Sequence, residues 1–336
     1  MKTLFIMFFV SAFLGYLLLV PDKQRKAVMF FDLNTTGSLR GIWALVVLMV
    51  HIPSSYQNPV QDMIGSFAYV GVTFFFMTSG YGLFLSMEKK PNFLKNFWRK
   101  RLPGLLLPML ISNIVFVVAK FWLKLEWSFQ DVFMVTGWVK QLLIFYGIFW
   151  IIYGVLPETL PQRSKTGLFI AAIALFSITA YAGWLSFITV WPTESFGFIY
   201  GALLYRYRDH FVRFATSGWV VKCAVACVLS AVTGVGYLML KHWVFFGDYL
   251  LKILLGALIL LLLLLWNAKK PIGNYVAKFL GSISYEIYLL HGAVFVILQA
   301  CRTDWNSGVF VASSILVTVL IATAVHTICA HILKKE

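Results

Sequence analysis

The hydrophobic pattern of this 336-residue chain is a succession of long apolar runs separated by short polar segments. A helix needs about 20 predominantly apolar residues to cross the ~30 Å hydrocarbon core of a bilayer. The pattern predicts an all-α polytopic membrane helix bundle of about eleven transmembrane helices. The expected spans lie near residues 4–20, 39–53, 67–86, 102–122, 136–156, 168–188, 195–206, 217–240, 247–266, 279–300 and 308–332, of which the second and seventh are short.

Composition agrees with a membrane protein. Hydrophobic residues make up 60% of the chain and charged residues only 12%, with a net charge of +15. A soluble domain carries about twice that share of charged residues. The Lys and Arg residues gather in alternate short loops, which is typical of membrane orientation and not of nucleic-acid binding.

The distribution of cations predicts the orientation. If the N-terminus lies outside, the cytoplasmic loops hold Lys23, Arg25, Lys26, Lys89, Lys90, Lys95, Arg99, Lys100, Arg101, Arg163, Lys165, Arg206, Arg208, Arg213, Lys269, Lys270, Lys278, Lys334 and Lys335. The opposite loops hold only Lys2, Lys124, Lys241 and Arg302. Because short cytoplasmic loops are enriched in Lys and Arg, we expect an odd number of spans, an outer N-terminus and a cytoplasmic C-terminus.

The first span has a second interpretation, a cleaved signal peptide, since it begins with Lys2 and an apolar stretch. No clear small-x-small cleavage site follows it, and cleavage would leave the cations at 23–26 outside. We therefore predict an uncleaved extra helix and cytoplasmic linker over residues 1–36, followed by one membrane unit over residues 37–336.

The cysteines indicate neither a metal site nor a disulfide framework. Cys223 and Cys227 stand four residues apart on one predicted helix, and Cys301 and Cys329 lie elsewhere. This spacing matches no metal-binding motif, so the sequence predicts no metal.

Arg40 and His51 bracket an apolar segment whose ten intervening residues carry no charge. Eleven steps of about 100° end roughly 20° past three full turns, so both side chains project from one helix face, about 16 Å apart along the axis. Ionisable groups at such depths are costly and usually functional. The structural alternative is an Arg that marks the cytoplasmic end of the helix and a His that hydrogen-bonds to a neighbour.

A second histidine is expected at a similar depth. His291 lies in the tenth span, about 18 Å above the start of that helix. Ser284, Tyr288 and His291 follow an i, i+4, i+7 spacing and share a face, whereas Glu286 points to the opposite side. The alternative is a polar stripe that holds helices together, as Ser, Tyr and His often do in membranes.

Two further segments carry candidate residues. The third span contains Ser79, Gly80 and Tyr81, where small residues permit close helix approach. Arg99, Lys100 and Arg101 stand just before a predicted helix start, and basic side chains beside free backbone N–H groups suit phosphate binding. Positive-inside anchoring, or attraction to anionic lipid, accounts for the same three cations.

Together these segments resemble the membrane acyltransferase 3 family, ten-helix acyltransferases of bacterial surface glycans. The resemblance rests on Arg40-x10-His51, on GVTFFFMTSGYGLFLS (71–86), on FWRKRLPGLLLP (97–108), on WVKQLLIFYGIFWIIYGVLP (138–157), which Trp138 leads, and on SYEIYLLH (284–291). One Arg-x10-His is a weak signal, but five segments in order over about residues 38–300 are specific. The chain departs from the family at Thr73 and Tyr81 and in its extra first helix, and within these 336 residues we expect no esterase domain of the kind that some members carry.

The resemblance implies transfer of an acyl group, usually acetyl, from cytoplasmic acyl-CoA to a sugar hydroxyl of a cell-surface or exported polysaccharide, by an integral protein of the bacterial inner membrane. It makes His51 the expected general base, with Arg40, in the catalytic set. A covalent acyl-His intermediate is the alternative that the sequence does not separate. The expected acyl-CoA ligands are Arg40, Arg99, Lys100 and Arg101, and the expected substrate-binding residues are Ser79, Tyr81, Trp138, Ser284, Tyr285, Glu286, Tyr288 and His291.

The competing class is a polytopic transporter or flippase for a glycan or lipid-linked substrate. Such proteins show internal repeats and intramembrane carboxylates that couple to ions. Here Glu286 is the main acidic residue deep in a span, and no inverted repeat is evident. A passive structural membrane protein, the other alternative, does not need two histidines at matching depth. The acceptor glycan, the acyl chain and the oligomeric state are left open by the sequence.

Overall fold

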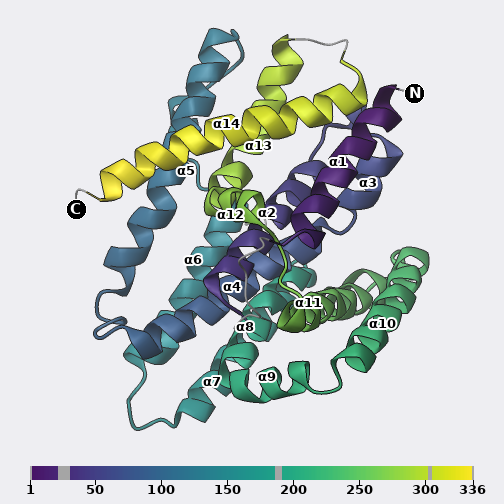
Figure 1. Cartoon of the computed structure of the whole chain (residues 1–336). Helices are drawn as coiled ribbons and strands as arrows, with labels where there is room; N and C mark the ends of the chain where they lie inside the picture. The colour runs from purple at the N-terminus through teal and green to yellow at the C-terminus, as the bar shows by residue number, and fades with distance from the viewer. Residues whose placement is uncertain (1, 22–30, 186–190, 302–304, 335–336) are drawn as a thin grey trace.

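The computed structural model describes residues 2–21, 31–185, 191–301 and 305–334, and within these ranges every regular element is a helix (Figure 1). This confirms the predicted all-α membrane bundle. Five of the cations used to predict the orientation lie outside the described residues: Lys23, Arg25, Lys26, Arg302 and Lys335.

Fourteen α-helices are described. Those of the first half are α1 (Lys2–Leu19), α2 (Leu33–Val50), α3 (Pro59–Gly65), α4 (Ala68–Lys89), α5 (Phe97–Trp122), α6 (Gly137–Trp150) and α7 (Gln162–Tyr181). Those of the second half are α8 (Phe196–Arg206), α9 (Arg208–Thr216), α10 (Trp219–Leu240), α11 (Lys252–Lys269), α12 (Tyr275–Ser282), α13 (Ser284–Cys301) and α14 (Ser307–Leu333). Short 3₁₀ or π-helical segments are η1 (Ser54–Tyr56), η2 (Phe129–Phe133), η3 (Ile151–Val155), η4 (Thr193–Ser195) and η5 (Phe246–Leu251).

Ten helical segments in the described ranges are long and apolar enough to cross a membrane. They include α2, whose 18 residues exceed the short span that the hydrophobic pattern indicated. The remaining expected span, 195–206, is α8, an 11-residue helix too short to be counted with the others.

Contacts on both sides of α8 hold this short helix in the bundle. Before its start, the Gln141 amide donates to Ser195 Oγ at 2.8 Å, and Lys252 Nζ lies 2.9 Å from Glu194 Oε1. Just after its end, Arg208 forms a bidentate ion pair with Glu88, the penultimate residue of α4. The helix therefore runs parallel to α4, and the eleventh crossing that the charge pattern favours stays a prediction.

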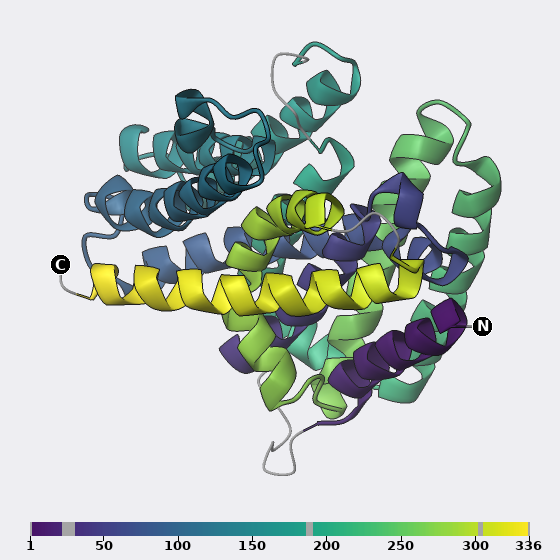
Figure 2. The same cartoon turned by 90° about the horizontal axis from the view of Figure 1, so that it is seen from above.

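Loops that are distant in sequence meet at the same end of the bundle. At one end, Asn58 donates to Ser307, and Thr3 donates to Asn306. At the other end, the Asn274 amide donates to the carbonyl oxygens of Tyr16 and Val20 at 3.1 Å, which fixes the end of α1. The two chain ends lie on opposite sides of the molecule in both views (Figures 1 and 2).

Helix α2 runs through the centre of the bundle and is buried along most of its length. It crosses α12 at backbone distance, because a Cβ on Gly281 would lie 1.8 Å from the Gly37 carbonyl oxygen. A Cβ on Gly41 would likewise lie 2.3 Å from the carbonyl oxygen of Ala277. Glycines at such crossings allow helix backbones to approach closely within membranes.

We expect Gly281→Ala to destabilise the protein, since the new methyl group overlaps the backbone of α2 and the two helices must separate. Overpacking of this kind costs about 1–3 kcal/mol or more. Thermal unfolding of the detergent-solubilised protein should show a lower midpoint. Gly292→Ala is the matched control, because its Cβ meets nothing within 4 Å; equal midpoints for both variants would contradict the packing argument.

Candidate active site

The two intramembrane histidines predicted at matching depth lie side by side. The ring centroids of His51 and His291 are 4.9 Å apart. His51 caps the C-terminal end of α2 and is exposed, whereas His291 lies within α13 and is buried. The pair therefore has one accessible ring and one ring enclosed beneath it.

Each ring is held by a hydrogen bond to the preceding helical turn. Nδ1 of His51 lies 2.8 Å from the carbonyl oxygen of Val47, and Nδ1 of His291 lies 3.2 Å from that of Ile287. A carbonyl oxygen only accepts, so Nδ1 carries the proton in each bond and Nε2 of a neutral ring keeps its lone pair. No hydrogen bond to either Nε2 occurs within the described part of the chain. Both rings are therefore arranged to accept a proton or to act as nucleophiles.

Below the histidines, five of the predicted site residues line one small cavity: Arg40, Trp138, Ser284, Tyr285 and Tyr288. The cavity has a volume of about 20 Å³, enough for about one water molecule. It leads toward the histidines, because the ring centroid of Tyr288 lies 5.3 Å from that of Trp138 and 5.8 Å from that of His291. A chain-like substrate can pass here only if these side chains move.

Two buried donors on the wall of this cavity have no acceptor. Arg40 Nε and Trp138 Nε1 form no hydrogen bond among the described residues. Buried donors are rarely left unpaired, because each loses its hydration without replacement. The cavity thus offers two N–H groups to an acceptor that arrives with a ligand, such as an amide or thioester carbonyl.

Glu286 has a partner that the sequence did not reveal. It faces away from His291, as helical spacing predicted, and its Oε1 lies 2.9 Å from Nδ1 of His326 on α14. Its other oxygen, Oε2, is buried without a hydrogen bond in the described structure. Glu286 and Tyr146 both interact electrostatically with Arg40. The carboxylate therefore supplies negative charge near Arg40, which is half-buried.

The three cations at the start of α5 are not equivalent. Arg99 and Lys100 are exposed, whereas the guanidinium of Arg101 lies 5.7 Å from the ring centroids of both Phe93 and Tyr146. Arg101 is therefore the member of this cluster that points into the bundle, toward the region of Arg40. Local sequence does not distinguish the three.

Two predicted substrate-binding residues lie apart from the histidines. Tyr81 packs against Phe31 and Tyr205 near the end of α4, with ring centroids 4.7 and 5.8 Å away. Ser79 is half-buried on the same helix, and its hydroxyl has no hydrogen-bond partner in the described ranges. Neither residue forms a hydrogen bond or a ring contact with His51 or His291 in the described structure.

Sequence reasoning missed His326, Tyr146 and the burial of Lys165. His326 lies 40 residues from Glu286 in the sequence. Tyr146 belongs to the segment led by Trp138 and was not singled out as a site residue. Lys165 was counted as a loop cation, yet only 2% of it is exposed. No grouping of three or more His, Cys, Asp or Glu side chains suited to a metal occurs in the described residues.

Comparison with protein families matches residues 37–327 to the family described as an acyltransferase domain. The match covers Arg40, His51, His291 and Glu286 and begins within α2, so α1 lies outside it. No curated protein matches this chain, and no solved structure matches it.

We expect Glu286→Gln to lower the free energy of unfolding by about 1–3 kcal/mol, because the amide removes the charge opposite Arg40 and weakens the bond to His326. The measurement is thermal or denaturant unfolding of the purified protein. Glu126→Gln, an exposed loop substitution, should leave stability unchanged. An unaltered unfolding curve for Glu286→Gln would show that its charge does not support this part of the bundle.

Proposed function

We propose that this chain, which belongs to the acyltransferase domain family, transfers an acyl group from cytoplasmic acyl-CoA to a sugar hydroxyl of a cell-surface or exported polysaccharide. Acetyl is the expected acyl group. The family match establishes an acyltransferase embedded in the membrane. The observation that carries the finer proposal is the pair of neighbouring histidines with free Nε2 atoms, placed above a cavity that begins at Arg40.

His51 is the general base in this proposal, because it is the accessible member of the pair. Its Nε2 accepts the proton of the acceptor hydroxyl while the hydroxyl oxygen attacks the thioester carbonyl. The carbon–sulfur bond then breaks, and the proton passes from the imidazolium to the departing thiolate, which yields the ester and free CoA. Such proton transfer contributes about 10²–10⁴-fold to a rate.

Donor binding is supported by the line of polar groups below the histidines. Arg101 is the inward-facing cation, and charge-assisted hydrogen bonds from arginine suit the phosphates of CoA. Arg40 Nε and Trp138 Nε1 then meet carbonyl oxygens of the pantetheine arm or the thioester. Because the cavity holds only about one water molecule, donor binding must displace side chains along it.

The same proposal gives the orientation. The end of the bundle that holds Arg101 also holds Lys89, Lys90 and Lys95, so the positive-inside rule places it at the cytoplasm. His51 then lies in the outer half, where an exported glycan reaches it. This arrangement corresponds to a bacterial inner-membrane protein with its N-terminus outside.

His51→Ala should abolish transfer of radiolabel from acetyl-CoA to a glycan extract, with a loss of about 10²-fold or more, because the base is removed. The matched control is His242→Ala, an exposed histidine far from the pair in sequence, which should retain wild-type transfer. Normal transfer by folded His51→Ala would eliminate the assigned base.

Arg101→Gln should raise the KM for acyl-CoA by about tenfold or more, since one charge-assisted interaction with phosphate is lost. Arg99→Gln removes an exposed cation two residues earlier and should change the KM little. Initial rates measured over a range of acyl-CoA concentrations separate the two. Equal KM values for wild type and Arg101→Gln would refute the donor path.

A further inference from the structure

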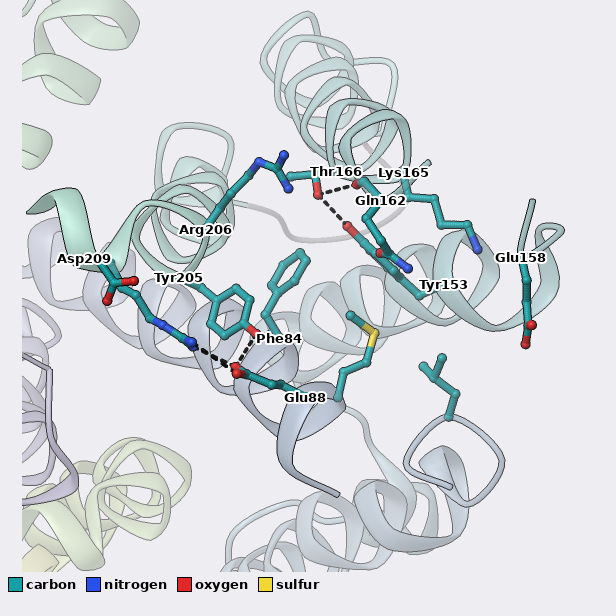
Figure 3. Close-up of a pocket in the computed structure, with 13 residues that line it drawn as sticks. Phe84, Glu88, Tyr153, Glu158, Gln162, Lys165, Thr166, Tyr205, Arg206 and Asp209 are labelled. Carbon is teal, nitrogen blue, oxygen red and sulfur yellow. Dashed lines mark hydrogen bonds and ion pairs between the residues drawn. The ribbon is translucent and has the colours of Figure 1, made fainter. Parts of the chain in front are cut away.

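Another cavity is much larger than the one beside Arg40. It has a volume of about 750 Å³ and lies where the ends of α4, η3 and α8 meet the start of α7 (Figure 3). This size is in the range of small-molecule sites, about 300–1,000 Å³. Its rim carries four exposed polar residues, Glu158, Gln162, Arg206 and Asp209.

The floor of this cavity holds a buried cation without a counter-ion. Lys165 is 2% exposed, and its Nζ donates to the carbonyl oxygen of Leu156 at 3.2 Å. No carboxylate lies within ion-pair distance of Lys165 in the described part of the protein. Figure 3 shows the two rim carboxylates, Glu158 and Asp209, at opposite edges of the cavity. A buried ammonium normally has a charged partner, so the Lys165 ammonium is free to form an ion pair with an anionic ligand.

The cavity is lined by three acidic and three basic residues, but the pairing of these charges leaves two cations to attract an anion. Arg208 and Glu88 neutralise each other in the bidentate ion pair, and the Tyr205 hydroxyl also donates a hydrogen bond to Glu88. Arg206 forms no ion pair among the described residues, and it interacts electrostatically with Tyr153. Lys165 and Arg206 therefore remain for a ligand, and the carboxylates Glu158 and Asp209, which also lack ion pairs in the described structure, stand at the edges of the cavity.

Backbone groups add to this attraction. The 20-residue helix α7 begins at Gln162 after Pro161, and no side chain caps it. The first N–H groups of a helix are free donors, and the helix dipole favours an anion beside them. Lys165 stands in the first turn of the same helix, so the ammonium and the helix start converge on one region.

The apolar walls define the remainder of the ligand. Phe84, Tyr153 and Tyr205 present aromatic rings, and Met87 and Leu94 present aliphatic surface. A small inorganic anion does not contact these apolar walls. A phosphate ester that carries a flat or apolar group uses both the cations and the rings.

A block of aromatic side chains separates this cavity from the proposed donor path. The ring centroid of Phe84, at the cavity wall, lies 5.3 Å from that of Phe149. The ring centroid of Phe97 lies 6.1 Å from that of Phe149 and 5.8 Å from that of Tyr146. Phe84, Phe97 and Phe149 are all buried. Arg101 and Arg40 are on the Tyr146 side of this block.

We propose that this cavity is a second ligand site, separate from the acyl-donor path, that binds a phosphate ester through Lys165, Arg206 and the start of α7. The phosphate ester is either a soluble nucleotide-like molecule or the headgroup of an anionic lipid. The site lies at the end of the bundle that carries Arg101, so its ligand comes from the same side of the membrane as the acyl donor.

The test is equilibrium binding of radiolabelled ADP to the full-length protein in nanodiscs of zwitterionic lipid. Lys165→Met should weaken ADP binding by about tenfold or more, because a charge-assisted hydrogen bond is lost while side-chain length is kept. Arg206→Gln should weaken it as well. Arg163→Met, two residues away and exposed, is the matched control and should bind as wild type does. Thermal unfolding confirms that each variant is folded.

Phosphatidylglycerol in the nanodiscs distinguishes the two sources. If it suppresses ADP binding to wild type, the ligand is a lipid headgroup; if it does not, the ligand is soluble, and either result supports the site. Equal ADP affinity of wild type and Lys165→Met overturns the proposal. Loss of ADP binding in Arg101→Gln but not in Lys165→Met overturns it too, because ADP then occupies the donor path. Neither result depends on whether acyl transfer is observed.

Discussion

The close contact between α2 and α12 is the constraint on which the site depends. Gly37 and Gly281 touch through their backbones, and Gly41 meets Ala277 in the same way. Because α13 follows α12 directly, this contact fixes the height of α13 relative to α2. About ten residues further along each helix, that height brings His291 beside His51. A larger side chain at the crossing would shift the two rings relative to each other.

The second constraint is that polar groups inside an apolar bundle must find partners within the protein. Most do. Gln141 uses its amide to hold Trp191 and Ser195, and Glu194 pairs with Lys252. Eleven buried side-chain atoms lack a hydrogen bond within the described structure, and three of them, Arg40 Nε, Trp138 Nε1 and Glu286 Oε2, belong to neighbouring parts of one region. Incomplete pairing there agrees with a site whose remaining partner is a substrate.

Much of this site could be predicted from helical geometry. The shared face of Arg40 and His51, the depth of His291 and the position of Glu286 on the opposite side of its helix from His291 all follow from spacing along single helices. The resemblance to a family added Trp138 and the residues of 284–291. Tertiary contacts were not predictable in this way. The partner of Glu286 is on another helix, 40 residues away, and only packing shows that Arg101 points inward while Arg99 does not.

Apolar length predicted the segment at residues 195–206, and the structure has α8 there, an 11-residue helix. Hydrogen bonds with Gln141 hold the segment before it inside the bundle, and the sequence did not reveal them. The burial of Lys165 has a similar origin. Its sequence neighbours Arg163 and Gln162 are exposed, and only the packing of α7 against η3 encloses the lysine.

The central claim is that acyl transfer takes place at the His51–His291 pair, and a structure with a bound donor tests it most directly. The measurement is a cryo-electron microscopy structure of the protein with a non-reactive thioether analogue of acetyl-CoA. The account predicts that the nucleotide end lies near Arg101 and that the acyl end reaches the Nε2 atoms of the two histidines. An analogue whose acyl end lies in the cavity above Lys165, with the histidine pair untouched, would contradict it.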